Sequence, residues 1–522
     1  MLRILGSSNS FSQSVDRRAF LQIGAASLGL SELLFHENSL SANDPAAGRR
    51  DSRLSRVQNS DAARALESAE PGFGRAKNIL LLYLQGAASQ FETWDPKPDA
   101  PEEIRGRLGA TSTSVPGTFI CDRLPRLARI ADRMTIVRSM THPHNNHSNL
   151  YTLTGAPALD FSNETNPRDI RHRPFFGSVL DYLAEQSQSD STSDVPRNIA
   201  LPWQFSSEGS FVRRAGPYAS FLGHGFNPVW TEFAGKATKK VSRVSFFDAL
   251  GRVEVSDPFL GITPESRMRI STDAQLREGI TLDRLDQRRS LVTQFDHQVG
   301  HLNDALAGKS LDRFTAKAYS MMTSSKVRDA LDVGLEPMSV REKYGMTLFG
   351  QAALTGRRLL EAGCRIVSVF WDEYKVVNTA WDTHFDHFTR LENELLPGFD
   401  AAVSSLLLDL EERGLLKETL VLCLTEHGRT PKIDNLDRGS GRDHWSQAYS
   451  VMLAGAGIRA GTVLGASDVT GAFVKDHPVS PEDILATMYH LKGIDPETTI
   501  PDLRKRPVRL VDNGSVISDL LA

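Results

Sequence analysis

Histidines and carboxylates gather in three short segments of the last third of the sequence. The segments read Trp381-Asp382-Thr383-His384, Thr425-Glu426-His427-Gly428-Arg429 and Gly441-Arg442-Asp443-His444-Trp445. Imidazole and carboxylate together are the ligands that proteins use for zinc, manganese or iron. The candidate metal ligands are therefore Asp382, His384, Glu426, His427 and His444.

Each group also has a structural interpretation. Glu426 and His427 are compatible with a buried ion pair to Arg429 or Arg442. His444 is compatible with a histidine packed by its neighbour Trp445. A further pair, Asp386-His387, opens a predicted helix, where the aspartate complements the helix dipole and the histidine is a surface residue. These alternatives stay open at the level of the sequence.

The elements that must position these residues are buried strands and the loops after them. Glu426 follows an apolar run at 419–424, and a second run at 79–84 ends at Gln85-Gly86. In open α/β sheets, ligands bind outside the carboxyl ends of the strands. Further strands are predicted at 134–137, 365–370 and 449–453, and helices at 178–185, 281–307, 347–362, 386–413 and 481–491. This alternation predicts an α/β sandwich whose central sheet is mainly parallel.

Overall composition excludes some classes of protein. The chain has 522 residues, a net charge of −4 and 24% charged residues without a basic block, which argues against a nucleic-acid surface. Three widely separated cysteines give no disulfide framework. The length suits one large α/β domain or two domains.

The N-terminus carries an export pattern. Arg17-Arg18 precedes Phe20-Leu21 and a short Gly/Ala-rich apolar run, which resembles a twin-arginine signal. An amphipathic helix is the alternative. We expect a signal at 1–42, a flexible linker at 43–75 and a domain at 76–522 with a helical insertion around 205–340. The apolar run is too short to span a bilayer, so we expect no stable membrane span after signal removal and a periplasmic or extracellular location.

Several segments together resemble the DUF1501 family. They are NILLLYLQGAASQFETWDPKPD from residue 78, RLPRLARIADRMTIVRSMTH, REKYGMTLFGQAALTGRRLLEAGCRIVSV, WDTH, EHGRTP and GRDHW. The family is grouped with the alkaline phosphatase-like superfamily, which includes sulfatases. The resemblance implies a central, mainly parallel sheet between helical layers and transfer or hydrolysis of phosphate or sulfate esters at a two-metal centre.

Matching the superfamily pattern to this chain implies a specific ligand set. Glu426-His427 and His444 fill the places of a late Asp-His pair and a following His. Asp382 with His384 matches an earlier Asp and His, although the spacing differs, so that Asp386 or His387 is an alternative. The first strand normally ends in an Asp ligand, where this chain has Gln85. A neutral amide offsets none of the cation's charge, so we expect one tightly held divalent metal, such as zinc or manganese.

The nucleophile is the least defined part of the resemblance. Sulfatases carry it at the head of a helix that ends in Leu-Thr-Gly, and counting back from Leu153-Thr154-Gly155 reaches Asn145, which cannot serve. Ser148, next to His147 as a base, is the nearest hydroxyl, with an N-cap as its structural alternative. Ser89, in the turn after the first strand, is a second candidate. We also expect at least one of the histidines at 142, 144 and 147 to face the site.

Two functions and one structural alternative follow. The first is an exported metal-dependent hydrolase of phosphate or sulfate esters, in which Arg442 or Arg429 stabilises anionic oxygens and the metal activates a hydroxyl or a water. The second is a catalytically degenerate relative that binds an anionic glycan or a protein partner, which Gln85 and Asn145 favour. The third is a structural extracellular protein without a metal. Fold alone does not choose among them.

Overall fold

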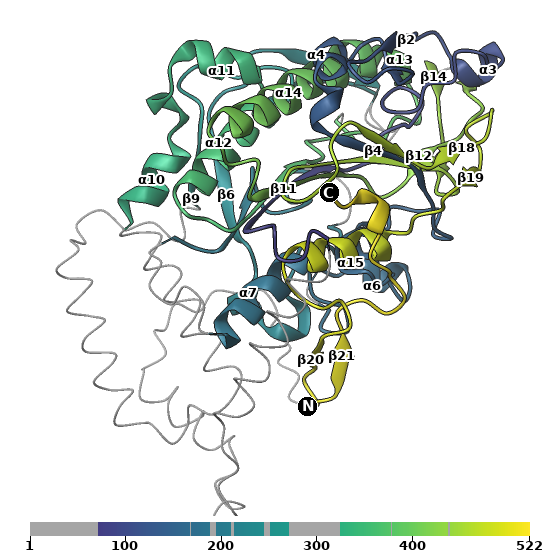
Figure 1. Ribbon diagram of the computed structural model, residues 1–522. Coiled ribbons are helices and arrows are strands. Elements are labelled where there is room, and N and C mark those ends of the chain that lie inside the picture. The colour runs from purple at the N-terminus through teal and green to yellow at the C-terminus, as the bar shows by residue number, and fades with distance from the viewer. Residues whose placement is uncertain are drawn as a thin grey trace, which may run out of the picture. The chain divides into compact units, whose positions relative to one another are not determined.

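The computed structural model describes residues 71–167, 169–187, 195–209, 213–244, 251–270, 324–376, 378–436 and 439–522 (Figure 1). All of them belong to one compact unit, Ala63–Ala522. The predicted signal, most of the predicted linker and the predicted helix at 281–307 lie outside the described residues.

A nine-stranded sheet runs through this described part of the chain. Its centre is β1 (Asn78–Leu84), which pairs in parallel with β10 (Ile366–Trp371) and β11 (Thr419–Leu424). Outward from β11 lie β16 (Tyr449–Ala454), β4 (Thr135–Met140) and β17 (Thr462–Leu464), and outward from β10 lie β5 (Asn198–Leu201), β6 (Val229–Ala234) and β9 (Arg267–Ile270). Within this sheet, only β16 and β9 pair antiparallel to their neighbours. The predicted α/β fold with a mainly parallel central sheet is thus confirmed.

Both faces of the sheet are covered by helices (Figure 1). Every side chain of β1 is buried, and its alternate residues enter two separate cores. Leu80 and Leu82 pack with the helices α12 (Leu348–Glu361) and α14 (Leu396–Glu412), whereas Leu81 packs with α7 (Phe176–Gln186) and α15 (Pro481–Leu491). A strand that is covered on both faces reads as a continuous apolar run, which is why the sequence indicated it clearly.

Two helix starts show how local sequence fixes the covering layers. Ser480 and Asp483 form a capping box at the start of α15, and the side chain of Thr347 accepts a hydrogen bond from the Gly350 amide at the start of α12. Such caps satisfy amide groups that have no partner inside the helix. The predicted helix at 481–491 is confirmed.

Two predictions of secondary structure need correction. The predicted helix at 386–413 is divided into α13 (His387–Arg390), a π-helical turn (Leu391–Leu395) and α14, which has a proline in its first turn. The helical character expected for 205–340 is wrong for 229–244 and 251–270, where β6, β7 (Lys240–Val244), β8 (Arg252–Ser256) and β9 form strands. Residues of β8 and β9 alternate in exposure, with charged side chains outward. Only two residues of each strand are therefore apolar, which makes these strands hard to recognise in the sequence.

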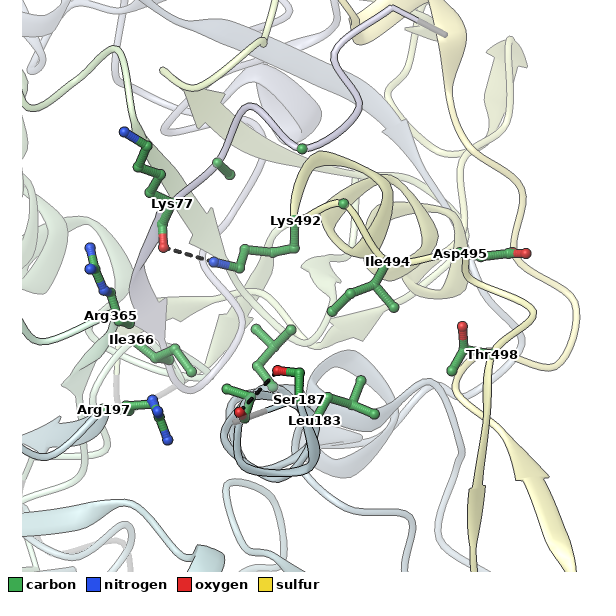
Figure 2. Close-up of a pocket in the computed structure, with 15 residues that line it drawn as sticks. Lys77, Leu183, Ser187, Arg197, Arg365, Ile366, Lys492, Ile494, Asp495 and Thr498 are labelled. Atoms are coloured by element: carbon green, nitrogen blue, oxygen red, sulfur yellow. Dashed lines mark hydrogen bonds between the residues drawn. The ribbon is translucent and has the colours of Figure 1, made fainter. Parts of the chain in front are cut away.

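A cavity of about 650 Å³ opens at the edge of the sheet where β1, β5 and β10 begin. Figure 2 shows its lining, in which Lys492 Nζ donates a 2.7 Å hydrogen bond to the carbonyl oxygen of Lys77. Arg197 and Arg365 also line it, together with apolar residues of α7 and the segment after α15. We call this the amino-edge cavity. In the described part of the chain, no helix is long and apolar enough to cross a bilayer.

Candidate metal centre

The opposite edge of the sheet collects polar residues from three neighbouring strands. Because β1, β10 and β11 are parallel, their carboxyl ends meet there, and they are followed by Gln85-Gly86, Asp372-Glu373 and Glu426-His427. Glu426 Oε1 accepts a 2.7 Å hydrogen bond from the Gly86 amide, which ties the ends of β1 and β11 together. This is the edge at which the sequence placed the site.

Gly86 lets a further loop approach this edge. Its φ is +97°, and a Cβ atom there would lie 2.3 Å from the backbone nitrogen of Asp382. The Trp381 amide donates a 2.8 Å hydrogen bond to the carbonyl oxygen of Gln85. A side chain at position 86 would push this loop away, so the glycine is what allows Asp382 to reach the strand ends.

Asp382 lies in a cluster of side chains that also contains His147, His384, His427 and His444. One of its carboxylate oxygens lies 3.0 Å from His384 Nε2 and 3.5 Å from His444 Nε2, and the other lies 3.3 Å from His147 Nε2. Arg429 Nη2 also donates to it. Burial raises the pKa of Asp382, but the charges of Arg429 and His147 outweigh burial and hold the pKa well below its usual value. Asp382 is therefore an anion at neutral pH.

Two overlapping groups of side chains have the spacing of metal ligands. One is His147, His427 and His444, and the other is Asp382, His384 and His444; within each group the ligand atoms lie within 4.8 Å of one another. The structure thus brings together four of the five candidate ligands, and His427 and His444 face each other with ring centroids 4.6 Å apart. Their role as ligands stays a prediction.

Two of the histidines, His384 and His427, are oriented by contacts to their Nδ1 atoms. His427 Nδ1 lies 2.8 Å from the carbonyl oxygen of Gly428, and His384 Nδ1 lies 2.6 Å from Asp443 Oδ1. Such contacts fix the tautomer and leave Nε2 with its lone pair, as in metal-bound histidines. His427 Nε2 is buried without a hydrogen-bond partner. Burial, followed by the charges of His444 and His147, lowers the pKa of His427 well below its usual value, so its ring is neutral.

Glu426 contacts His147, which was not predicted. Glu426 belongs to neither ligand group in the described residues; its Oε1 lies 2.8 Å from His147 Nδ1. Burial lowers the pKa of His147, but Asp382 and Glu426 outweigh it and raise the pKa to about 9. Glu426 is therefore paired with a histidine and not with Arg429 or Arg442. The expectation that one of the loop histidines faces the site is met by His147.

Ser148 stands next to this cluster but makes other contacts. It precedes α5 (Asn149–Thr154), and its hydroxyl donates to Asn146 Oδ1 without capping the helix. Both ring nitrogens of His147 face carboxylates, so in this arrangement His147 is not directed at the Ser148 hydroxyl. Asn145, at the nucleophile position of the family pattern, accepts a 2.9 Å hydrogen bond from the Ser446 amide. A catalytic role for Ser148 stays a prediction. The alternative nucleophile, Ser89, donates to Glu92 Oε2.

Arg442 forms an ion pair with the buried Glu92, and all of its N–H groups have acceptors within the protein. Its Nε and Nη2 donate to Glu92 Oε1 at 3.1 and 2.7 Å, and its remaining N–H groups donate to backbone carbonyl oxygens. His387 Nε2 lies 3.1 Å from the other oxygen of Glu92 and is fully buried, so its interpretation as a surface residue is wrong. Binding of a substrate oxygen by Arg442 would require one of these contacts to break.

Asp372 and Glu373 are site residues that the sequence analysis missed. Burial raises the pKa of Asp372 to about 8 and that of Glu373 to about 7, and Glu373 Oε1 accepts a 3.3 Å hydrogen bond from Gln85 Nε2. The signal was present, because these carboxyl groups directly follow a predicted strand, as Glu426 does. Applying the strand-end rule to every predicted strand would have found them.

A family model identifies the family of this chain. A family model described as "Protein of unknown function (DUF1501)" matches residues 76–521. The chain belongs to the DUF1501 family. A search of curated proteins gave no match.

Two solved structures with some similarity to this DUF1501 chain are a sulfatase and a phosphonate monoester hydrolase. A sulfatase from Pseudoalteromonas sp. (PsFucS1) has 12% sequence identity and a TM-score of 0.35, with 92% of this chain and 77% of that chain covered. A phosphonate monoester hydrolase from Silicibacter pomeroyi has 12% identity and a TM-score of 0.31, with 82% and 76% covered.

Proposed function

We propose that this protein is a metal-dependent hydrolase of phosphate or sulfate esters. The observation that carries the proposal is the buried Nε2 of His427, which has no hydrogen-bond partner and lies in a group of three histidines with ligand spacing. A buried polar atom without a partner costs free energy unless a ligand satisfies it. The neutral imidazoles of His427 and His444 beside the ionised Asp382 suit zinc or manganese, and His147, whose pKa is raised to about 9, would give up a proton on binding the ion.

The residues of the chain would divide the work as follows. Asp382, His384, His427 and His444 would hold a divalent ion together with His147, and Glu426 and Asp443 would orient the histidines. The ion would supply Lewis acidity, which polarises an ester oxygen. The side chains of Asp382, His384 and His444 keep 15–25% of their surface exposed, so a substrate can reach this side of the cluster. The nucleophile of such a reaction is Ser148 or a water.

A second candidate function is supported by Gln85. This neutral side chain stands where the family pattern has a charged ligand, and its Oε1 is buried without a hydrogen-bond partner. A site with one ligand fewer would hold one ion and bind an anionic glycan or a partner without turnover. Metal stoichiometry and turnover together separate the two functions.

The test uses purified full-length protein after metal reconstitution. We expect one zinc or manganese ion per chain, near-complete loss of it in His427→Ala and His444→Ala, and full occupancy in the control His224→Ala, whose histidine is exposed. Turnover of aryl phosphates and aryl sulfates is measured on the same samples. A wild-type protein that holds no metal would contradict the proposal, whereas metal binding without any turnover would support the binding function.

We also propose export by the twin-arginine route, from the Arg17-Arg18 pattern alone. Replacing both arginines with lysine should leave the precursor in the cytoplasm, because this route reads the arginine pair. Fractionation of cells that express wild type and variant measures this. Normal export of the variant would contradict the proposal.

A further inference from the structure

Arg214 is a third arginine near the cluster, and its contacts differ from those of Arg429 and Arg442. Its Nη1 is 3.7 Å from Glu164 Oε1, and its buried Nε has no hydrogen-bond partner among the residues that the structure describes. The charges of Arg214 and His147 both act on the pKa of Glu164 and on that of Glu373. Glu164, the ion-pair partner of Arg214, accepts a 3.4 Å hydrogen bond from Asn146, so Arg214 and Glu164 lie next to the loop that carries His147 into the candidate metal centre.

The other two arginines have no comparable donor to offer. All five N–H groups of Arg442 are directed at Glu92 or at carbonyl oxygens. Arg429 is fully buried and donates to Asp382 and to the carbonyl oxygens of Ala87, Gly86 and Arg442. Arg390 also has a buried Nε without a hydrogen-bond partner among the described residues, but its other nitrogens donate to Thr379 and to the carbonyl oxygens of Ala380 and Asp382. Arg214 has only its ion pair with Glu164 in the described part of the chain, so its guanidinium would be the one available to an anionic ester.

Glu164 adds an acceptor beside this donor. Its Oε1 is buried and has no hydrogen-bond partner, although it lies at ion-pair distance from Arg214. Its other oxygen accepts a 3.4 Å hydrogen bond from Asn146 Nδ2, next to His147 in the chain. An unsatisfied donor and an unsatisfied acceptor side by side match a ligand that carries both an anionic oxygen and an O–H group.

These two groups distinguish phosphate from sulfate. A phosphate monoester titrates with a second pKa near 6, so near that pH it carries an O–H that can donate to a carboxylate. A sulfate monoester has only acceptor oxygens, which a carboxylate repels. We propose that Arg214 and Glu164 form an oxyanion subsite that selects phosphate monoesters over sulfate monoesters. This inference rests on the proposed function and names its substrate class.

The experiment measures binding of inorganic phosphate and inorganic sulfate to metal-loaded full-length protein at pH 6 by calorimetry. We expect the wild type to bind phosphate at least about tenfold more tightly than sulfate. Arg214→Ala should weaken phosphate binding about tenfold or more, with Arg214→Lys intermediate because a lysine keeps the charge but not the planar fork. Arg213→Ala, which alters the exposed neighbour, should stay within about twofold of the wild type.

Glu164→Gln tests selectivity, because the amide offers a donor in place of an acceptor. It should weaken phosphate binding and strengthen sulfate binding. Metal content and melting temperature of each variant confirm that the fold and the centre are intact. Unchanged phosphate binding in Arg214→Ala, or equal wild-type affinities for the two anions, would overturn the inference alone. A metal-loaded wild type that binds neither anion would overturn the ester hydrolase proposal as well.

Discussion

The lining of the amino-edge cavity and the candidate metal centre at the carboxyl edge differ in how well their polar groups are satisfied. At the amino edge, Lys492 donates to the backbone carbonyl oxygen of Lys77 (Figure 2), and Lys77 pairs with Glu418 at 2.5 Å. The other cations that line the amino-edge cavity also have protein partners, since Arg197 lies 3.9 Å from Asp181 and Arg365 donates to Asn78. At the carboxyl edge, His427 Nε2 and Gln85 Oε1 are buried and have none.

The difference shows that the size of a cavity does not locate chemistry. The amino-edge cavity holds about 650 Å³, yet its polar groups need no ligand to satisfy them. The carboxyl edge holds histidines and carboxylates with shifted pKa values and polar atoms that lack partners. Unsatisfied buried groups with shifted pKa values are typical of functional sites. Four changes test this comparison.

The largest effect is expected from breaking the network behind the carboxyl edge. Arg442→Ala leaves Glu92 buried without its cation, and such changes cost about 3–5 kcal/mol of unfolding free energy. Urea unfolding of the metal-free protein measures it. The matched control is Lys77→Ala, because Lys77 and Glu418 are exposed partners whose pair contributes about 1 kcal/mol or less. Equal losses in the two variants would contradict the contrast between the edges.

A smaller effect is expected at Gln85. Gln85→Asp should bind the metal about tenfold more tightly, or about 1.4 kcal/mol, because a carboxylate offsets the charge of the cation. The same variant should be less stable without metal, since the new carboxylate lies beside Glu373 and Glu426. Gln85→Asn, which keeps a neutral amide, is the control and should show no gain. Metal titration of the three proteins decides between a role of charge and a role of size.

The sequence predicted the central fold because strands covered on both faces and well-capped helices carry local signals. β1, β11 and α15 were found nearly residue by residue, and four of the five predicted ligands converge. The ionic partner of Arg442 could not be predicted, because Glu92 is 350 positions away. Arg214 carries no local signal either, since only the fold of its loop brings it to Glu164. The contact between Glu426 and His147 could not be predicted, because the position of His147 depends on that same long-range packing.

The pH dependence of the metal-free protein sharpens the comparison further. The folded pKa of Asp372 is raised to about 8 and that of Glu373 to about 7, both mainly by burial. A raised carboxyl pKa gives stability that is complete below the unfolded value near 4 and is lost as the pH rises through the folded value. We therefore expect the unfolding free energy to fall between about pH 4 and pH 8. In Asp372→Asn this fall should be smaller; an unchanged slope would show that the buried pair is not its source.

The smallest effect is expected at the amino-edge cavity. Lys492→Ala removes a hydrogen bond to a backbone carbonyl oxygen and shortens a partly exposed side chain, and changes at such surface positions stay within about 0.5 kcal/mol. Metal content and phosphate binding should match the wild type, because Lys492 lies at the opposite ends of β1 and β10 from the centre. The same metal and anion titrations provide the measurement. A loss of metal or phosphate binding in Lys492→Ala would mean that the amino-edge cavity and the metal centre are coupled. That result would contradict the contrast drawn between them.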